Sequence, residues 1–307
     1  MIPVLLDLDL AMGAPGSDID DGFALALAVA DPEIDLQLIT TVNGNTDAAT
    51  ATTLTAELLD RLGAAEIPVR QGAMRALLRP ATRIGRLPPD VTPRPAHPEH
   101  AVSALIERVR AQPGELTLVA VGPLTNVALA MVLDPAFAPG LQDLVIMGGV
   151  FAGTTGSLEM PGEFNVWSDP EAARIVLESG VVARWVGLDV TRQVRLTRAE
   201  ARMMAADPHR FVSFAGRYSV GWIDHLMRTD DPDTDSTPLH DPLAVAAVTR
   251  PELLTFVDAH LAVHLDGVAR GVLIADQHPG RAPNARIAVA VDPAGFAEHF
   301  TACLRLL

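Results

Sequence analysis

Short apolar runs alternate along the chain with longer segments in which apolar residues recur at helical spacing. The runs expected to form strands are residues 4–6, 36–42, 67–69, 116–121, 144–147 and 183–186, with a few more within 256–291. The segments expected to form helices are residues 22–30, 47–62, 99–110, 171–178 and 243–248, with others within 197–227 and 295–306. Such alternation is typical of parallel sheets covered by helices. The pattern therefore predicts an α/β fold: one open, doubly wound domain over residues 1–307, with helices on both faces of a mostly parallel sheet.

Polar residues directly follow several of the expected strands. They are Asp7 and Asp9, Asn43 and Asn45, Thr125 and Asn126, and the pair Gly148 and Gly149. Ligands of doubly wound sheets bind beyond the carboxyl ends of the strands. We therefore expect these groups to meet in one cleft.

The first cluster has an unusual density of carboxylates. Asp7 and Asp9 end the first apolar run, and Asp18, Asp20 and Asp21 precede the next helix, which places five acids within fifteen residues. Neighbouring carboxylates repel one another, and a hard divalent cation such as Ca²⁺ or Mg²⁺ relieves that repulsion. Alternatively, the acids that precede the helix cap it, but capping does not explain Asp7 and Asp9 at the end of the strand. The spacing therefore favours a metal site.

Two later stretches also carry candidate chemistry. Glu163 and Asn165, two residues apart, are placed to hold hydroxyl groups in one cleft, while Asp169 is expected to cap the helix that follows. His240 and Asp241 precede a strongly apolar helix, which predicts Asp241 as its N-cap. A single histidine is more often structural than catalytic, but a neighbour that can ligate a metal makes His240 a candidate.

Composition excludes several function classes. The chain of 307 residues is 49% hydrophobic and carries a formal net charge of −15, which argues against binding to nucleic acid or an anionic membrane. All 23 basic residues are arginine, so mechanisms that need a lysine are absent. Cys303 is the only cysteine, which excludes an internal disulfide and a thiolate zinc site. With no signal-peptide pattern and no long apolar segment, we expect a cytoplasmic protein.

Taken together, these pieces resemble the nucleoside hydrolase family, the calcium-dependent inosine-uridine preferring nucleoside N-ribohydrolases. The matching pieces are Asp7-Leu8-Asp9 with Asp20-Asp21-Gly22, Asn43-Gly44-Asn45, residues 121–126, Met147-Gly148-Gly149, Glu163-Phe164-Asn165-Val166 with Asp169-Pro170-Glu171-Ala172, and His240-Asp241-Pro242. Each is weak alone, but the ordered set spans nearly the whole chain and is specific.

The resemblance implies hydrolysis of the N-glycosidic bond of purine or pyrimidine ribonucleosides, in base salvage. It implies a Ca²⁺ ion held by Asp9, Asp21, Asp241 and the backbone carbonyl of Thr125, all hard oxygen donors. Asp9 would also act as general base toward a water molecule, and His240 would assist the departing base. A homodimer or homotetramer that takes a small-molecule ribonucleoside is the expected assembly.

The resemblance also implies the groups that hold the substrate. Asp20, Asn45, Glu163 and Asn165 would bind ribose hydroxyls, and Met147 would line the ribose pocket. Trp222 and His225 fall in the helical region that faces the base in relatives, although core packing of Trp222 is an alternative. Ser157 stands where many members have an asparagine near the ribose 5′ end, so a different 5′ group is an open possibility.

Two segments depart from the family pattern. The insert 10–19 is longer than usual, and we expect a lip over the site or an oligomer contact there. Residues 72–98, rich in arginine and proline, are expected to form a mobile surface loop, and residues 72–90 lack the usual histidine-containing, glycine-rich signature. A phosphohydrolase with an Asp-x-Asp motif is the first alternative, but such an enzyme needs a lysine and this chain has none. A hydrolase of a modified ribosyl conjugate and a non-catalytic ribose-binding protein stay open as further alternatives.

Overall fold

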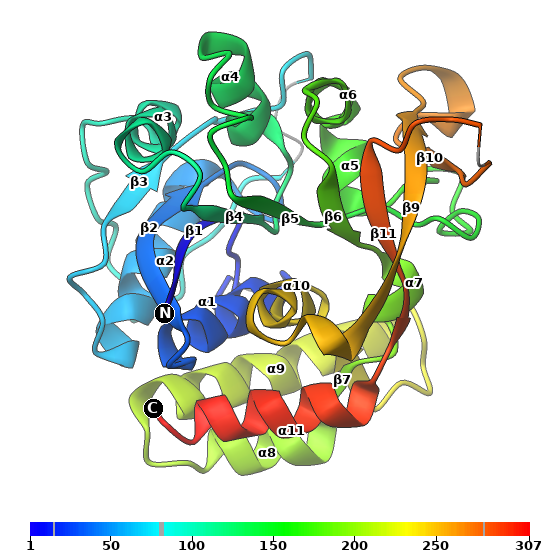
Figure 1. The fold of residues 1–307 in the computed structure, drawn as a ribbon. Helices are drawn as coiled ribbons and strands as arrows, with labels where there is room; N and C mark the ends of the chain where they lie inside the picture. The colour runs from blue at the N-terminus through cyan, green and yellow to red at the C-terminus, as the bar shows by residue number, and fades with distance from the viewer. Residues whose placement is uncertain (15, 80–82, 279) are drawn as a thin grey trace.

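The computed structural model describes residues 1–14, 16–79, 83–278 and 280–307. A nine-stranded sheet in the order β10-β9-β11-β6-β5-β4-β1-β2-β3 crosses the molecule (Figure 1). The strands are β1 (Ile2–Leu8), β2 (Ile34–Thr41), β3 (Val69–Gln71), β4 (Thr117–Ala120), β5 (Asp143–Met147), β6 (Ala183–Val186), β9 (Leu254–Val263), β10 (Leu273–Asp276) and β11 (Ala285–Val291). β9 runs antiparallel to its two neighbours, and the other pairings are parallel.

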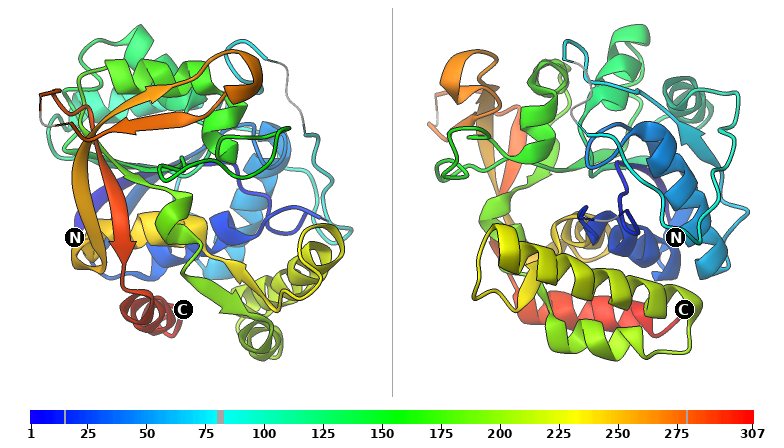
Figure 2. Two further views of the ribbon diagram at one scale, coloured as in Figure 1. Left: turned by 90° about the vertical axis from the view of Figure 1, so that its right-hand side faces the viewer. Right: turned by 180° about the vertical axis from the view of Figure 1, so that it is seen from behind.

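Helices cover both faces of this sheet (Figures 1 and 2). One face carries α3 (Ala101–Ala111), α4 (Thr125–Leu133) and α6 (Pro170–Glu178). The other carries α1 (Asp20–Ala30), α2 (Ala48–Leu62) and α10 (His240–Thr249), beneath which lie α8 (Arg198–Ala205), α9 (Arg210–Thr229) and α11 (Pro293–Leu304). The remaining elements are α5 (Phe164–Ser168), α7 (Leu188–Thr191), β7 (Arg195–Thr197), β8 (Ser236–Pro238) and two short 3-10 turns, Pro251–Leu253 and Gly267–Ala269. The mostly parallel α/β architecture expected from the sequence is confirmed.

Two apolar layers hold the sheet between its helices. Successive residues of β1 belong to different layers. Val4 and Leu6 pack in the layer of α1 and α10, whereas Leu5 packs in the layer of α3 and α4. Side chains of a strand point to opposite faces in turn, and a central parallel strand buries both. Its carboxylates therefore emerge only where the strand ends. Among the described residues, no helix combines the length and the hydrophobicity needed to cross a membrane.

Several local expectations need correction. The short strand expected at 67–69 lies at Val69–Gln71. Asp241 is not the N-cap of α10, because Leu239 precedes the helix and Asp241 lies in its first turn. The acids before α1 do not cap it either: Ile19 is the N-cap, without a side-chain hydrogen bond. Capping by Asp169 is confirmed, since its side chain accepts a hydrogen bond from the Ala172 backbone N–H.

The first half of the insert 10–19 is buried, whereas Gly16 is exposed and Ser17 and Asp18 are half-buried, so a lip over the site stays a prediction for these residues only. Leu10 and Met12 are fully buried and belong to the core layer beside α1. Burial of these apolar side chains removes them from water, which favours their place in the core. Pro15, within this insert, lies outside the described residues, as do residues 80–82 of the 72–98 stretch.

Candidate active site

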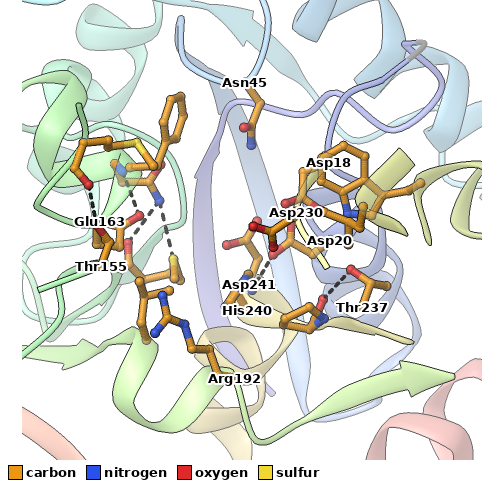
Figure 3. Close-up of a pocket in the computed structure, with 18 of the residues that line it drawn as sticks. Asp18, Asp20, Asn45, Thr155, Glu163, Arg192, Asp230, Thr237, His240 and Asp241 are labelled. Atoms are coloured by element: carbon orange, nitrogen blue, oxygen red, sulfur yellow. Dashed lines mark hydrogen bonds between the residues drawn. The ribbon is translucent and has the colours of Figure 1, made fainter. Parts of the chain in front are cut away.

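A cavity of about 670 Å³ opens at the carboxyl edge of the sheet (Figure 3). Loops that follow β1, β2, β5 and β6 contribute to it, together with α9 and the start of α10. Of the residues that the sequence singled out, those lining the cavity are Asp20, Asn45, Met147, Ser157, Glu163, Asn165, Trp222, His240 and Asp241. Residues separated by up to 221 positions in the chain thus share one pocket.

Three carboxylates cluster where two helices begin. Carboxyl oxygens of Asp20, Asp21 and Asp241 all lie within 4.8 Å of one another. The first two lie in the first turn of α1 and the third in the first turn of α10, and these helices pack side by side. The Asp241 backbone N–H donates to Asp20 Oδ2 over 3.2 Å. Helix N-termini favour negative charge, which is why both helices tolerate acids there.

Asp9 is held beside this cluster by backbone groups. Its own N–H donates to Asp21 Oδ1 over 3.1 Å, and its Oδ2 accepts a hydrogen bond from the Asn45 N–H at 2.5 Å. Its Oδ1 is buried and has no hydrogen-bond partner among the described residues. A Cβ at Gly44 would stand 2.0 Å from Asp9 Oδ2, so a glycine is needed for this close approach. The carboxylate is fixed, with one oxygen available.

The electrostatics of the cluster fit a hard cation. Burial raises the pKa of Asp9 to about 7, and the charge of Glu163 adds to the shift. The pKa values of Asp20, Asp21 and Asp241 lie well above the ordinary range, first because of burial and then because like charges face one another. A divalent cation coordinated by these oxygens would offset that repulsion. The donor set therefore fits a metal ion.

Thr125 reaches the site differently from the other expected ligands. Its hydroxyl donates to Asp169 Oδ2 over 2.7 Å at the buried start of α4. That bond fixes the turn after β4, which carries the carbonyl named by the family resemblance. The role of this carbonyl as a metal ligand stays a prediction.

The opposite wall is built around Glu163. Its carboxylate accepts hydrogen bonds from the backbone N–H groups of Asn165 (2.7 Å), Gly149 (3.0 Å) and Val166 (3.1 Å). The Asn165 side-chain amide donates to the Val121 carbonyl over 2.8 Å and to the Met147 carbonyl over 3.3 Å. These bonds orient an acid and an amide toward the cavity, where both can meet hydroxyl groups of a sugar.

His240 lies at the edge of the cavity with its ring fixed by Thr191. The Thr191 Oγ1 lies 2.7 Å from His240 Nδ1. Burial lowers the pKa of His240 to about 3, and the charges of Arg192 and Arg195 contribute. The imidazole is therefore neutral near pH 7. When the hydroxyl donates to Nδ1, the ring proton resides on Nε2, where it can be donated to a ligand.

Trp222 and His225 form a stacked pair, with ring centroids 5.1 Å apart and planes 15° apart. Trp222 lines the cavity, whereas His225 is not among the lining residues and stacks on the Trp222 ring. An indole face at a pocket wall can stack on a planar base. Core packing alone does not account for this tryptophan.

Several lining residues were missed by the sequence reasoning. They include Arg83, Thr155, Phe164, Arg192, Arg195, Asp230 and Asp231, whereas Asp18, which also lines the cavity, belongs to the acidic cluster that the sequence indicated. Arg83, from the 72–98 stretch, lies over the Phe164 ring at 4.6 Å and donates to Asn45 Oδ1 at 3.5 Å. Arg192 and Arg195 come shortly after the expected strand 183–186, so their position at a strand end was an available signal.

Comparisons with known proteins agree with this geometry. Residues 4–298 match the family model described as inosine-uridine preferring nucleoside hydrolase. The chain is 32% identical to the pyrimidine-specific ribonucleoside hydrolase RihA of Citrobacter koseri, over 97% of this chain and 96% of that one. A plant nucleoside hydrolase (PpNRh1) superimposes with a TM-score of 0.88 at 29% identity, covering 99% and 98% of the two chains. A purine-preferring ribonucleoside hydrolase from Gardnerella vaginalis gives a TM-score of 0.86 at 28% identity, covering 98% of each.

The fold and the site thus define a hydrolase of N-glycosidic bonds. The chain belongs to the inosine-uridine preferring nucleoside hydrolase family, whose members hydrolyse ribonucleosides. The family assignment made from the sequence motifs is confirmed.

Proposed function

We propose that this enzyme hydrolyses ribonucleosides to free base and ribose in a Ca²⁺-dependent reaction in which Asp9 is the general base. The observation that carries the proposal is the buried Asp9 Oδ1, which lacks a hydrogen-bond partner among the described residues and lies beside three clustered carboxylates. A buried acceptor without a partner is costly unless a ligand completes it.

Asp9, Asp21 and Asp241 would hold the cation, with Asp20 adjacent to them. When bound, a Ca²⁺ ion would supply coordination for ribose hydroxyls and would lower the pKa of a nearby water. Ca²⁺ is the cation that we favour, because oxygen-only sites of several carboxylates suit its large, flexible coordination shell.

Different residues of the chain would then have separate roles in the reaction. Asp9 accepts the proton of the water that attacks C1′. Glu163 and Asn165 bind ribose hydroxyls, and the acidic wall stabilises the positive charge that develops on the sugar. The neutral His240 donates a hydrogen bond from Nε2 to the departing base.

The test is release of reducing sugar from uridine, cytidine, inosine, adenosine and guanosine, measured after chelation and again after addition of Ca²⁺. We expect release that needs Ca²⁺ and that is lost in the Asp9→Ala variant while the fold is kept. Undiminished release in chelator, or near-normal turnover by Asp9→Ala, would contradict the proposal. 2′-Deoxyuridine should react roughly 10⁴-fold more slowly than uridine, because buried polar groups meant for the 2′-hydroxyl would be unpaired.

A modified ribosyl conjugate is the second candidate substrate. The side chain of Ser157 is exposed in the 151–162 loop and lines the cavity, which leaves room at that wall. Ca²⁺ binding by calorimetry without release from any of the five nucleosides would favour this candidate.

A further inference from the structure

We infer that Arg192 and Arg195 form an anion site that stabilises the nucleobase as it departs with a negative charge. The inference rests on the proposed function and adds two catalytic residues to it. When the C1′–N bond breaks, these two arginines would stabilise the negative charge of the leaving base.

Charge is unevenly distributed around the cavity. The carboxylates that line it are those of Asp18, Asp20, Glu163, Asp230, Asp231 and Asp241. Arg192 directly follows α7 and Arg195 begins β7, and both line the part beside His240. In Figure 3, Arg192 and His240 lie at one side of the opening and Asn45 lies at the other. Two guanidinium groups therefore lie near His240 in a pocket that is otherwise rich in carboxylates.

The two guanidinium groups are positioned without a carboxylate partner. Within the described part of the chain, neither arginine has an ion pair within 4.0 Å. Arg195 is held by neutral oxygens, since its Nε donates to Ser236 Oγ over 2.7 Å and its Nη2 to the Ser236 carbonyl over 3.0 Å. Asp231 lines the same cavity and is the acid whose charge acts on Arg195. A positive charge is thus available to a ligand.

The reaction needs such a charge at this place. As the C1′–N bond breaks, its electron pair leaves with the base nitrogen, and positive charge develops on the sugar. The water oxygen bonds to C1′, its proton passes to Asp9, and the base anion afterwards takes a proton from solvent. Fixed cations that face a developing anion lower the barrier without needing to reorganise. The carboxylates and the two guanidinium groups of the cavity therefore match the two charges that the transition state separates.

The test compares two leaving groups in the presence of Ca²⁺. Uridine and inosine release the more basic anions, whereas 4-nitrophenyl β-D-ribofuranoside releases a less basic phenolate that needs less stabilisation to depart. We expect Arg192→Ala and Arg195→Ala to lower kcat on uridine or inosine by roughly 10- to 100-fold, below the loss for a fully buried donor because both side chains are exposed. The rate on the nitrophenyl riboside should stay within about threefold.

Two further variants separate charge from structure. Arg192→Lys keeps the charge and should recover most of the rate on uridine. Arg217→Ala, on the exposed side of α9 and bonded to Ser213, should match the wild type on both substrates. Equal losses on both leaving groups, or no loss on uridine, would overturn the inference while the proposed function stands. Failure of the wild type on every substrate would instead contradict the proposed function.

Discussion

The hydroxyl of Thr191 lies 2.7 Å from Nδ1 of His240 and so sets the orientation of the imidazole at the cavity edge. Thr191 ends α7 after β6, and His240 begins α10, so the contact joins two distant parts of the chain. A neutral histidine carries a proton on only one of its two ring nitrogens. A hydrogen-bond donor to one nitrogen places the proton on the other.

We therefore expect Thr191→Val to lower kcat on uridine by roughly tenfold, because the imidazole loses the partner that fixes its tautomer and orientation. Thr191→Ser keeps a hydroxyl and should retain most of the activity. Steady-state kinetics with both variants, at saturating Ca²⁺, test the role of the hydroxyl. A valine variant that turns over at the wild-type rate would show that this hydrogen bond is only structural.

Gly44 is expected to be intolerant of a side chain. A Cβ there would stand 2.0 Å from Asp9 Oδ2 and 2.8 Å from the Pro123 ring. Gly44→Ala must displace Asp9, and a misplaced general base should lower kcat by about 10²-fold or more. Kinetics combined with circular dichroism would separate this loss from unfolding.

Gly221→Ala is the matched control. Gly221 lies within α9, and a Cβ there meets no atom within 4 Å. Alanine in a helix interior is more favourable than glycine by about 1 kcal/mol, so this variant should be as active as the wild type and slightly more heat-stable. Equal activity of the two alanine variants would contradict the role assigned to the Gly44 backbone.

Ca²⁺ should stabilise the fold more strongly as the pH rises. The carboxyls of Asp20, Asp21 and Asp241 have raised pKa values, so the native state binds their protons more tightly than the unfolded chain does. Their contribution to stability is present at low pH and is lost as the pH rises through the raised values. Once the carboxyls have lost these protons, their negative charges repel one another, and a bound cation offsets this repulsion.

Calorimetry in chelator and in Ca²⁺ should therefore show a rise in Tm of about 5 °C near pH 8 and a smaller one near pH 5. The difference between the two conditions isolates the cluster from other titrating groups. Asp241→Asn should reduce the Ca²⁺-induced rise. A Tm that Ca²⁺ leaves unchanged at every pH would show that the cluster does not bind it.

Much of the fold could be read from periodicity. Residues 183–186 and 171–178 were expected as a strand and a helix, and β6 has those bounds while α6 begins one residue earlier. Helix ends were less predictable, because a carboxylate before a helix can cap it or lie in its first turn. Asp169 caps α6, whereas Asp241 does not cap α10 but faces Asp20 of α1. Only the packing of α10 against α1 distinguishes the two cases.

Ordered motifs at strand ends were enough to identify the family and part of the cavity lining, because parallel strands bring their carboxyl ends to one edge. The sequence by itself therefore determined the α/β class, the family and the acidic character of the site. Tertiary structure decided that Leu10 and Met12 of the insert are buried and that Arg192 and Arg195 lie beside His240. It also decided that the Asp9 carboxylate fits against the Gly44 backbone. These relationships depend on how elements far apart in the chain pack together, which local periodicity does not encode.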